Sequence, residues 1–231
     1  RSAQGTVYLT PCKGKLVAVP DADGRWKVWL TNELSWTVAI SSGQGKDLFL
    51  WDNAGTLTIE PSAAWTTDLA RADALTTKDG VQVNNAAIGS MPAQRGILLG
   101  SVYGSGVNTV DFTSSQRGVI NIHNPFLLWL YCKETSDNWN YSTDVFRESN
   151  GGSTLGTSRV GFIRPLAESS IIAVARSVVN GSVNLNAATG IGISSSTVNS
   201  AHIYGQGVGT AFAQTPLAFL VAMPAFGYYT F

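Results

Sequence analysis

Hydrophobic and polar side chains alternate along much of this chain. In residues 25–30, Trp26, Val28 and Leu30 fall on one side, because successive side chains of a strand point to opposite faces. We expect this face to be buried. No long segment repeats its apolar residues with the helical period, so the pattern predicts strands almost throughout the chain.

The first clear hairpin of the chain has an outgoing strand, 47–52, that is apolar on both faces. A three-residue connection that ends in Gly55 follows, and glycine can take the left-handed conformation that such turns need. In the return strand Leu57 and Ile59 point inward. Pro61 ends the pairing, because proline has no N–H to donate to a neighbouring strand.

Later stretches continue the strand pattern. The stretch 126–133 is apolar on both sides, so it needs a second sheet on one side and an extra segment or a neighbouring subunit on the other. Residues 68–75 are an exception, because their helix propensity, with Asp68 as N-cap, predicts at most two helical turns. An Asp-Gly hairpin turn is expected at 77–81. The other expected strands are 96–103, 119–122, 160–163, 171–177 and 218–221.

We therefore expect an all-β fold: an antiparallel β-sandwich of jelly-roll type, with a small N-terminal β-hairpin module and at most one short helix. A soft boundary near residue 65, where the strand pattern gives way to helix propensity, separates a module of residues 1–65 from a sandwich of residues 66–231. A single domain is the alternative, since 231 residues suit either arrangement.

Charged residues make up only 13% of the chain, against roughly one quarter in typical soluble domains. Small polar residues and 24 Gly take their place, which is typical of extracellular or virion proteins that hide part of their surface in an oligomer. The 15 basic and 15 acidic residues balance, so nucleic acid and acidic membranes are not expected partners. No apolar run reaches the roughly 18 residues of a membrane-spanning helix, and no membrane insertion is expected.

Cys12 and Cys132 are too few for a disulfide framework and have no metal-site spacing. We expect free, partly buried thiols, and pairing within the fold is the alternative. The chain begins with Arg1-Ser2-Ala3, without a methionine or a signal-peptide core. We therefore expect it to be a processed or excerpted piece of a longer product.

Three motifs suggest chemistry, and each has a simpler explanation. Residues 21–24, D-A-D-G, begin like a calcium loop but lack its later ligands, so a hairpin turn is expected. Residues 205–209, G-Q-G-V-G, lack the strand–helix context of a nucleotide-binding loop. His123 and His202 adjoin no nucleophile elbow, so structural roles are expected for both. We expect no metal and no cofactor.

Four carboxylates, Glu134, Asp137, Asp144 and Glu148, lie close together in sequence. Glycoside hydrolysis uses two carboxylates at a defined separation with unequal pKa values, so the cluster is compatible with a polysaccharide-degrading site. Charges on the solvent side of strands explain these residues at least as well.

Aromatic residues are the best candidates for ligand binding. Sugar rings stack on Trp and Tyr, and nearby Asn or Asp side chains hydrogen-bond the sugar hydroxyls. The richest such stretch, and our candidate glycan site, is Asp137, Asn138, Trp139, Asn140 and Tyr141. The alternative is that Trp139 and Tyr141 belong to the core.

Several longer stretches occur in a distinctive order and spacing. They are V-Y-L-T-P at 7–11, D-G-R-W-K at 23–27, D-L-F-L-W-D-N-A-G-T-L-T-I-E at 47–60, W-T-T-D-L-A-R-A-D-A-L-T-T-K-D-G-V-Q-V at 65–83, S-D-N-W-N-Y-S-T-D-V-F-R-E-S-N at 136–150 and the glycine-spaced A-T-G-I-G-I-S-S-S-T-V-N-S at 188–200. Together they resemble a family of bacteriophage and prophage virion proteins of tail-fibre or receptor-binding type. The chain departs from that family at 118–123, G-V-I-N-I-H, where the family is richer in aromatic residues.

The resemblance implies a non-enzymatic β-rich virion protein of fibre or adhesin class, exposed on the phage particle and homotrimeric. With the aromatic candidates above, the expected function is attachment to a host receptor, a glycan. Other virion proteins are expected partners. The alternatives are a purely architectural decoration of capsid or tail, or a polysaccharide-degrading spike. Two strands supply the candidates for the oligomer contact. Phe126, Leu128 and Trp129 lie on the stretch that is apolar on both sides, and Gly190 and Gly192 allow close approach of another chain.

Overall fold

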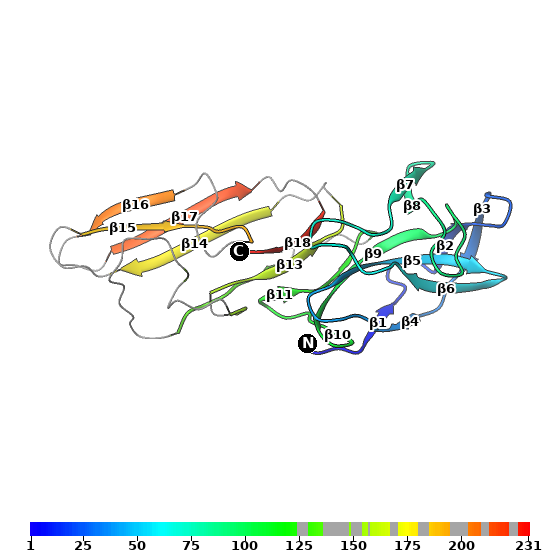
Figure 1. The fold of residues 1–231 in the computed structure, drawn as a ribbon, viewed down its shortest axis with the longest axis horizontal. Helices are drawn as coiled ribbons and strands as arrows, with labels where there is room; N and C mark the ends of the chain where they lie inside the picture. Colours follow the sequence, from blue (N-terminus) through cyan, green and yellow to red (C-terminus); the bar gives the residue numbers. More distant parts are fainter. Residues whose placement is uncertain are drawn as a thin grey trace.

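The computed structural model shows an all-β protein, and the predicted fold class is confirmed (Figure 1). No helix occurs among the residues that the structure describes, and nearly all strand pairs are antiparallel. Strands β14, β16 and β17, and β15 up to residue 189, are described by their backbone alone. The described residues are 1–123, 129–135, 148, 154–156, 158–166, 171–179, 185–194, 203–208, 213–221 and 226–231.

The described strands range from two to ten residues in length. Their bounds are β1 Thr6–Leu9, β2 Leu16–Pro20, β3 Trp26–Leu30, β4 Leu34–Thr37, β5 Gly45–Asn53, β6 Thr56–Pro61, β7 Leu75–Lys78, β8 Val81–Asn84, β9 Ile97–Gly106, β10 Thr109–Val110, β11 Gln116–Arg117, β12 Val119–Asn121, β13 Gly161–Arg164, β14 Ile171–Val179, β15 Leu185–Gly190, β16 Ile203–Val208, β17 Ala213–Val221 and β18 Gly227–Thr230.

A seven-stranded sheet dominates the described fold. Its main path runs β6-β5-β9-β8-β7, and β10 and β12 also pair with β9. The central strand β9 is buried over most of its length because it has neighbours on both edges and packed side chains on both faces. The sheet joins strands from both sides of residue 65, and the predicted division at that residue stays a prediction.

Gly100 marks an irregular point in the central strand. It lies opposite Leu48 of β5 and Asn121 of β12, and the β5–β9 register shifts just beyond it. A Cβ atom at Gly100 would lie 1.9 Å from the carbonyl oxygen of Ile120. Only glycine therefore allows β12 to approach β9 this closely.

The structure confirms the two predicted hairpins. Strands β5 and β6 pair from Asn53 opposite Thr56, so the turn consists of the two residues Ala54 and Gly55, one fewer than expected. Both have positive φ, 49° and 93°, as in a type I′ turn. The β7–β8 hairpin turns at Asp79-Gly80 in the same way, with φ of 50° and 84°.

Side chains from both faces of the large sheet form the core. Leu57 and Ile59 pack against the largest cluster, as predicted. The opposite face carries a second cluster, and a third cluster joins the sheet to β13 and β18. The buried members of the largest cluster are Val19, Trp36, Val38, Ile40, Leu48, Leu50, Val83, Ile97, Leu99, Val102 and Val110, and those of the second are Phe49, Trp51, Ile88, Met91 and Leu98.

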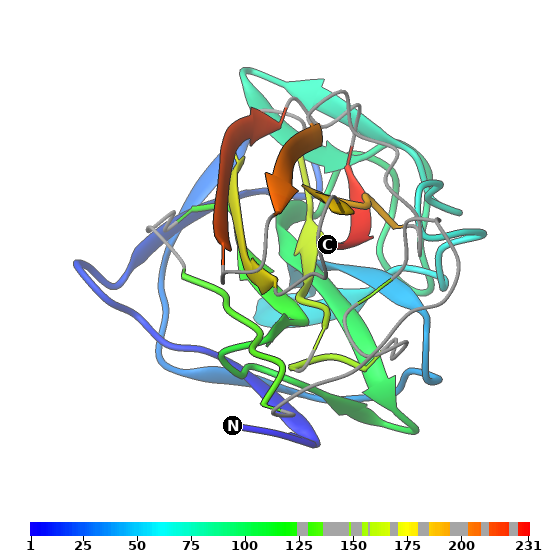
Figure 2. The ribbon, with the colours of Figure 1, turned by 90° about the vertical axis from the view of Figure 1, so that its left-hand side faces the viewer.

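The molecule is elongated, with the seven-stranded sheet at one end and β14–β17 at the other (Figure 1). The three-stranded sheet β11-β13-β18 lies between them. Strand β14 pairs with β17 and β15 pairs with β16, and these two ribbons face the viewer in Figure 2. The expected strands at 160–163, 171–177 and 218–221 correspond to β13, β14 and β17.

The predicted helix at 68–75 does not form. The chain instead makes a tight turn, in which the Thr66 N–H donates to the Ala70 carbonyl over 2.9 Å. The carbonyl of Asp68 accepts the N–H of Tyr228 at the start of β18, also over 2.9 Å. A tertiary hydrogen bond thus takes up a carbonyl that a helix would use internally, and the local helix propensity is overridden.

The predicted burial of the face formed by Trp26, Val28 and Leu30 is wrong for Val28 and Leu30, whereas Trp26 packs against the largest core cluster. Val28 is 63% exposed and Leu30 is 70% exposed, while Trp26 is half-buried. The hairpin β2–β3 packs its other face, which includes Val17 and Trp29, against the core. The alternation of residues along β3 defines two faces of the strand. It did not identify the buried face, because both faces carry large apolar residues.

The expected strand at 126–133 is wrong where it can be compared. Residues 124–128 lie outside the described residues, and residues 129–135 form no strand. Two isolated main-chain hydrogen bonds hold this segment in place of a continuous ladder, as described below.

Candidate functional site

The sequence-predicted glycan candidates Asp137, Asn138, Trp139, Asn140 and Tyr141 all lie outside the described residues. The same holds for two of the expected oligomer contacts, Phe126 and Leu128. The expected contact Gly190 ends β15 and is half-buried, and so is Gly192 just beyond it. The oligomer assignment of these residues stays a prediction.

Trp129 and Tyr131 form the clearest surface feature near the predicted glycan stretch. The Trp129 side chain is 78% exposed and the Tyr131 side chain is 66% exposed, whereas Leu130 between them is half-buried. Exposed and half-buried residues alternate from Trp129 to Thr135, so both aromatic side chains belong to the exposed set. We call this pair the aromatic platform.

The backbone beneath the aromatic platform is fixed to the rest of the protein. The Tyr131 N–H donates to the Ser114 carbonyl over 2.8 Å, and the Lys133 N–H donates to the Gly156 carbonyl over 3.0 Å. Because the anchors are main-chain bonds, they hold the segment without using either aromatic side chain. The platform therefore presents two large rings to solvent from a positioned backbone.

Both cysteines are free thiols, as expected. Cys132 is half-buried beside the platform, and burial raises the pKa of its thiol, so the unreactive protonated form dominates at neutral pH. Cys12 is exposed, so the expected partial burial is wrong for this residue.

One member of the predicted carboxylate cluster has a structural partner. Glu148 forms an ion pair with Arg159, whose Nε lies 2.8 Å from Glu148 Oε1. The Ser158 hydroxyl donates to the other carboxylate oxygen over 3.3 Å. Glu134 is half-buried, and Asp137 and Asp144 lie outside the described residues. The contacts of Glu148 with Arg159 and Ser158 suit a structural role for this carboxylate.

The remaining sequence motifs have structural roles where they are described. The Asp21 carboxylate accepts the N–H groups of Asp23 and Arg25 over 3.0 and 2.9 Å, which closes the predicted turn. His123 Nε2 lies 2.7 Å from the Leu98 carbonyl oxygen and so ties the chain after β12 to β9. The glycine-rich residues from 205 belong to strand β16 up to Val208, whereas His202 lies outside the described residues.

Sequence analysis missed a buried ion pair. Asp47 on β5 is completely buried, and Arg71 Nε lies 2.6 Å from its Oδ2 atom. The Ser101 hydroxyl donates to Asp47 Oδ1 over 2.5 Å and the Trp65 indole N–H donates to Oδ2 over 3.2 Å. Arg71 also donates to the Pro165 carbonyl, so this cluster links the seven-stranded sheet to the chain after β13. Its satisfied, enclosed geometry suits a structural role.

A stacked tyrosine pair lies close to this link. The rings of Tyr103 and Tyr228 are 3.6 Å apart at their centroids with an interplanar angle of 6°, and the Tyr103 hydroxyl donates to Asp68 Oδ1 over 2.9 Å. Burial, with a smaller contribution from the negative charge of Asp68, raises the pKa of Tyr228 to about 12. Burial and the hydrogen bond to Asp68 also raise the pKa of Tyr103. Both phenols are therefore neutral at physiological pH.

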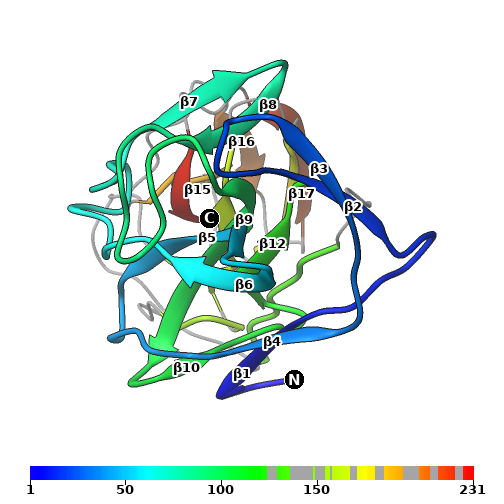
Figure 3. The same ribbon diagram turned by 90° about the vertical axis from the view of Figure 1, so that its right-hand side faces the viewer.

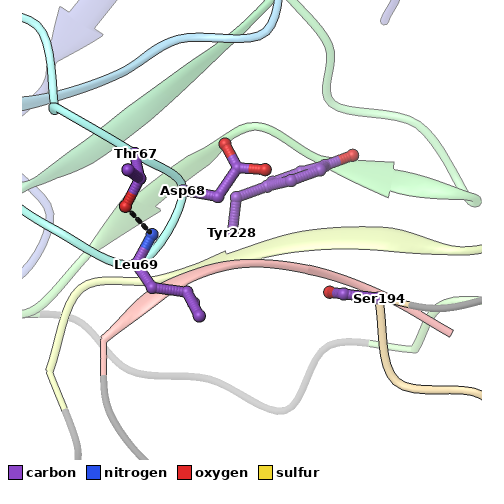
Figure 4. A pocket seen from close by; sticks show the side chains of 5 residues that line it. All are labelled: Thr67, Asp68, Leu69, Ser194 and Tyr228. Atoms are coloured by element: carbon purple, nitrogen blue, oxygen red, sulfur yellow. Dashed lines mark hydrogen bonds between the residues drawn. The ribbon is translucent and has the colours of Figure 1, made fainter.

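An open pocket of about 330 Å³ is lined in part by Tyr228 of this pair. Its lining combines an aromatic ring, an aliphatic side chain, a carboxylate and two hydroxyls, from the residues Thr67, Asp68, Leu69, Ser194 and Tyr228 (Figure 4). The hydroxyl of Thr67 accepts the Leu69 N–H over 3.3 Å, and that of Ser194 accepts the Thr230 N–H over 3.3 Å. These polar groups thus serve mainly to shape the surrounding turns.

Two further properties concern the part of the chain that the structure describes. There, no three His, Cys, Asp or Glu side chains converge in a way that could hold a metal ion. No helix in that part is long and apolar enough to cross a membrane. Compared with protein-family models, curated proteins and solved structures, the chain has no match.

Proposed function

We propose that this chain is a non-enzymatic phage virion protein of fibre or appendage type, exposed on the particle surface, that attaches to a host glycan. The observation that carries the binding role is the aromatic platform, because Trp129 and Tyr131 expose large rings from an anchored backbone. The virion assignment rests on the family resemblance of the sequence.

A glycan suits this platform better than a charged ligand. The apolar faces of sugar rings stack on exposed aromatic side chains, and the ring hydroxyls remain available to polar neighbours. The stretch of Asn, Asp and aromatic residues at 137–141 follows the platform closely in sequence and offers such neighbours. The chain has no net charge that would attract an ionic ligand over a distance.

A purely architectural role is the second candidate. Trp129 is also an expected subunit contact, and an exposed tryptophan on an apolar segment suits coverage by another chain. The polysaccharide-degrading alternative receives less support, because the Glu148 carboxylate is engaged by Arg159 and Ser158.

Binding to a panel of immobilised bacterial capsule and lipopolysaccharide glycans tests the proposal. We expect the wild-type chain to bind at least one glycan and the Trp129→Ala and Tyr131→Ala variants to lose roughly tenfold or more in affinity, since stacking on one ring contributes about 1.5 kcal/mol. Tyr8→Ala is the matched control, because Tyr8 is a 59% exposed tyrosine on β1. Glycan binding that survives both platform substitutions would contradict this site.

Release of new reducing ends separates binding from degradation. We expect none when the purified chain is incubated with the glycan that it binds. Sustained release, abolished by Glu134→Gln or Glu148→Gln, would favour the polysaccharide-degrading alternative instead.

A further inference from the structure

The pocket that Tyr228 borders is lined by three segments that are far apart in the chain. The 66–70 turn contributes three side chains, Ser194 lies shortly after β15, and Tyr228 lies on β18 (Figure 4). A volume of about 330 Å³ is at the lower end of the range for small-molecule sites, which begins at about 300 Å³. The pocket therefore suits a small ligand of about the size of a single sugar.

Main-chain hydrogen bonds fix the three segments of this pocket. The Tyr228 N–H donates to the Asp68 carbonyl over 2.9 Å, and the Ser194 N–H donates to the Thr230 carbonyl over 2.7 Å. Gly227 allows the turn to approach β18 closely, because a Cβ atom there would lie 2.7 Å from the Asp68 carbonyl oxygen. The lining is therefore positioned by the fold before any ligand binds.

Asp68 carries the only charge among the lining residues, and one of its carboxylate oxygens has no partner. Oδ1 accepts the Tyr103 hydroxyl over 2.9 Å, which orients the carboxylate. In the part of the chain that the structure describes, Oδ2 accepts no hydrogen bond and no ion pair includes Asp68. Figure 4 shows this carboxylate beside the Tyr228 ring. The pocket therefore offers a negative charge that has no cation of its own.

The other side chains of the lining indicate the body of the ligand. Leu69 is 51% exposed, and with the ring of Tyr228 it provides apolar contact. The hydroxyls of Thr67 and Ser194 each accept one main-chain N–H, and each keeps its own hydrogen to donate. A ligand that matches this lining has a cation, a compact ring with apolar carbon atoms, and oxygen atoms that accept hydrogen bonds.

We propose that this pocket binds an amino sugar with a free amino group, whose ammonium pairs with Asp68 Oδ2. A hydrogen bond between an ammonium and a carboxylate is stronger than one between neutral groups. A neutral sugar leaves the charge of Asp68 unpaired, and an acidic sugar is repelled by it. A lysine side chain supplies the cation but has no oxygen atoms for the hydroxyls of Thr67 and Ser194. The pocket shares no residue with the aromatic platform, so its binding does not depend on the glycan site proposed there.

Titration of the isotope-labelled wild-type chain with D-glucosamine and with D-glucose tests the proposal. The two sugars differ only at carbon 2, where an ammonium replaces a hydroxyl. At neutral pH and constant ionic strength, we expect glucosamine to shift the backbone amide NMR signals of the lining residues. Glucose should bind roughly fivefold more weakly, because it makes no ion pair with Asp68.

Asp68→Asn tests the charge directly, since the amide keeps an oxygen that can accept the Tyr103 hydroxyl. We expect this variant to bind glucosamine roughly fivefold more weakly than the wild type does and to bind glucose equally well. Asp23→Asn is the matched control, because Asp23 is an exposed aspartate in the turn of the β2–β3 hairpin, at the outside of the molecule (Figure 3). Circular dichroism checks that both variants are folded.

Several results would overturn the proposal. They are equal affinity of the wild type for the two sugars, glucosamine binding that Asp68→Asn leaves unchanged, and signal shifts confined to the aromatic platform. Tighter binding of Nα-acetyl-lysine amide than of glucosamine would also overturn it, in favour of a peptide ligand. The comparison of the two sugars uses the wild-type chain, so it decides the question even if the variant does not fold.

Discussion

At the scale of single residues, the most demanding interaction is the buried pair of Asp47 and Arg71. A carboxylate with no exposed surface is tolerated only when opposite charge and hydrogen bonds compensate for lost hydration. Arg71, Ser101 and Trp65 all contribute to that compensation. Removing the cation alone leaves a buried charge without its main partner.

We expect Arg71→Met to lower the free energy of unfolding by about 3 kcal/mol, because breaking one side of a buried ion pair exposes the full desolvation penalty of the other. Urea denaturation followed by tryptophan fluorescence measures the change. Lys27→Met is the matched control: its ion pair with Asp52 involves a 48% exposed lysine and should contribute within about 1 kcal/mol. Equal effects of the two variants would contradict the structural role of Arg71.

The tyrosine pair predicts a loss of stability at alkaline pH. Burial first, and the Asp68 carboxylate second, raise the pKa of Tyr228 from 10.0 to about 12 in the folded state. The unfolded chain therefore ionises first, so the stabilisation is complete below pH 10 and is lost as pH rises toward about 12. Tyr228→Phe should make the unfolding free energy fall less steeply over this interval.

Thermal unfolding at a series of alkaline pH values measures this dependence, and tyrosinate absorbance of the folded protein monitors the ionisation directly. Tyr8→Phe, which alters an exposed tyrosine on β1, serves as the control. A pH dependence that is the same in the Tyr228→Phe variant and in the wild type would show that another group is responsible.

None of these residue-scale contacts could be predicted from the sequence. Asp47 and Arg71 are 24 positions apart, and Tyr103 and Tyr228 are 125 apart, so only the completed fold brings them together. In the sequence, Asp47 marks the start of an apolar strand and Arg71 lies in a segment with helix propensity. Nothing in either local pattern indicates a partner.

At the scale of elements, local chemistry determined which predictions succeeded. The Gly55 and Asp79-Gly80 turns were predictable because glycine and aspartate tolerate the positive φ that these hairpins require. The helix predicted at 68–75 and the orientation of β3 depended on distant partners, Tyr228 and the main core, and so the sequence pattern misled us.

The β5–β6 turn offers an element-scale test. Ala54 has a φ of 49°, which alanine adopts with difficulty, so Ala54→Asn should stabilise the protein by about 0.5 kcal/mol because asparagine tolerates this conformation. Gly55→Ala should destabilise it by about 1 kcal/mol, and purely through the backbone, because a Cβ atom there meets nothing within 4 Å.

Urea denaturation measures both changes. Gly14→Ala is the matched control, since a Cβ atom at Gly14 also meets open space but the residue does not have a strained positive φ. We expect no loss of stability there. A Gly14→Ala variant as unstable as Gly55→Ala would rule out turn geometry as the cause.

At the scale of the whole molecule, the seven-stranded sheet tests the predicted division at residue 65. Strand β5 precedes that residue and pairs with β9, which follows it. A chain of residues 66–231 therefore loses the partner of its central strand, and we expect it to be unfolded or aggregated. Circular dichroism and gel filtration measure this outcome, with the full chain as control, and a folded, monomeric 66–231 fragment would support two domains.

The candidate site was predictable only in part. Aromatic clustering predicted a glycan site at 137–141, which lies outside the described residues, whereas the exposed rings of the described chain are those of Trp129, predicted as a subunit contact, and of Tyr131, for which no role was predicted. The side chains that are exposed depend on the main-chain hydrogen bonds to Ser114 and Gly156. Both residues are far in sequence from the residues that they hold. A pattern of alternating residues defines two faces of a segment, but it does not identify which of the two is exposed to solvent.

Residues 129–133 are held by their backbone, and this affects how the aromatic platform can vary between related chains. Main-chain hydrogen bonds and inward side chains keep the segment in place, while Trp129 and Tyr131 contribute little to packing. Exchanging these two residues therefore carries almost no penalty in stability. Under the glycan-binding role that we propose, ligand preference can therefore change by substitution of these two residues, while the fold beneath them remains the same.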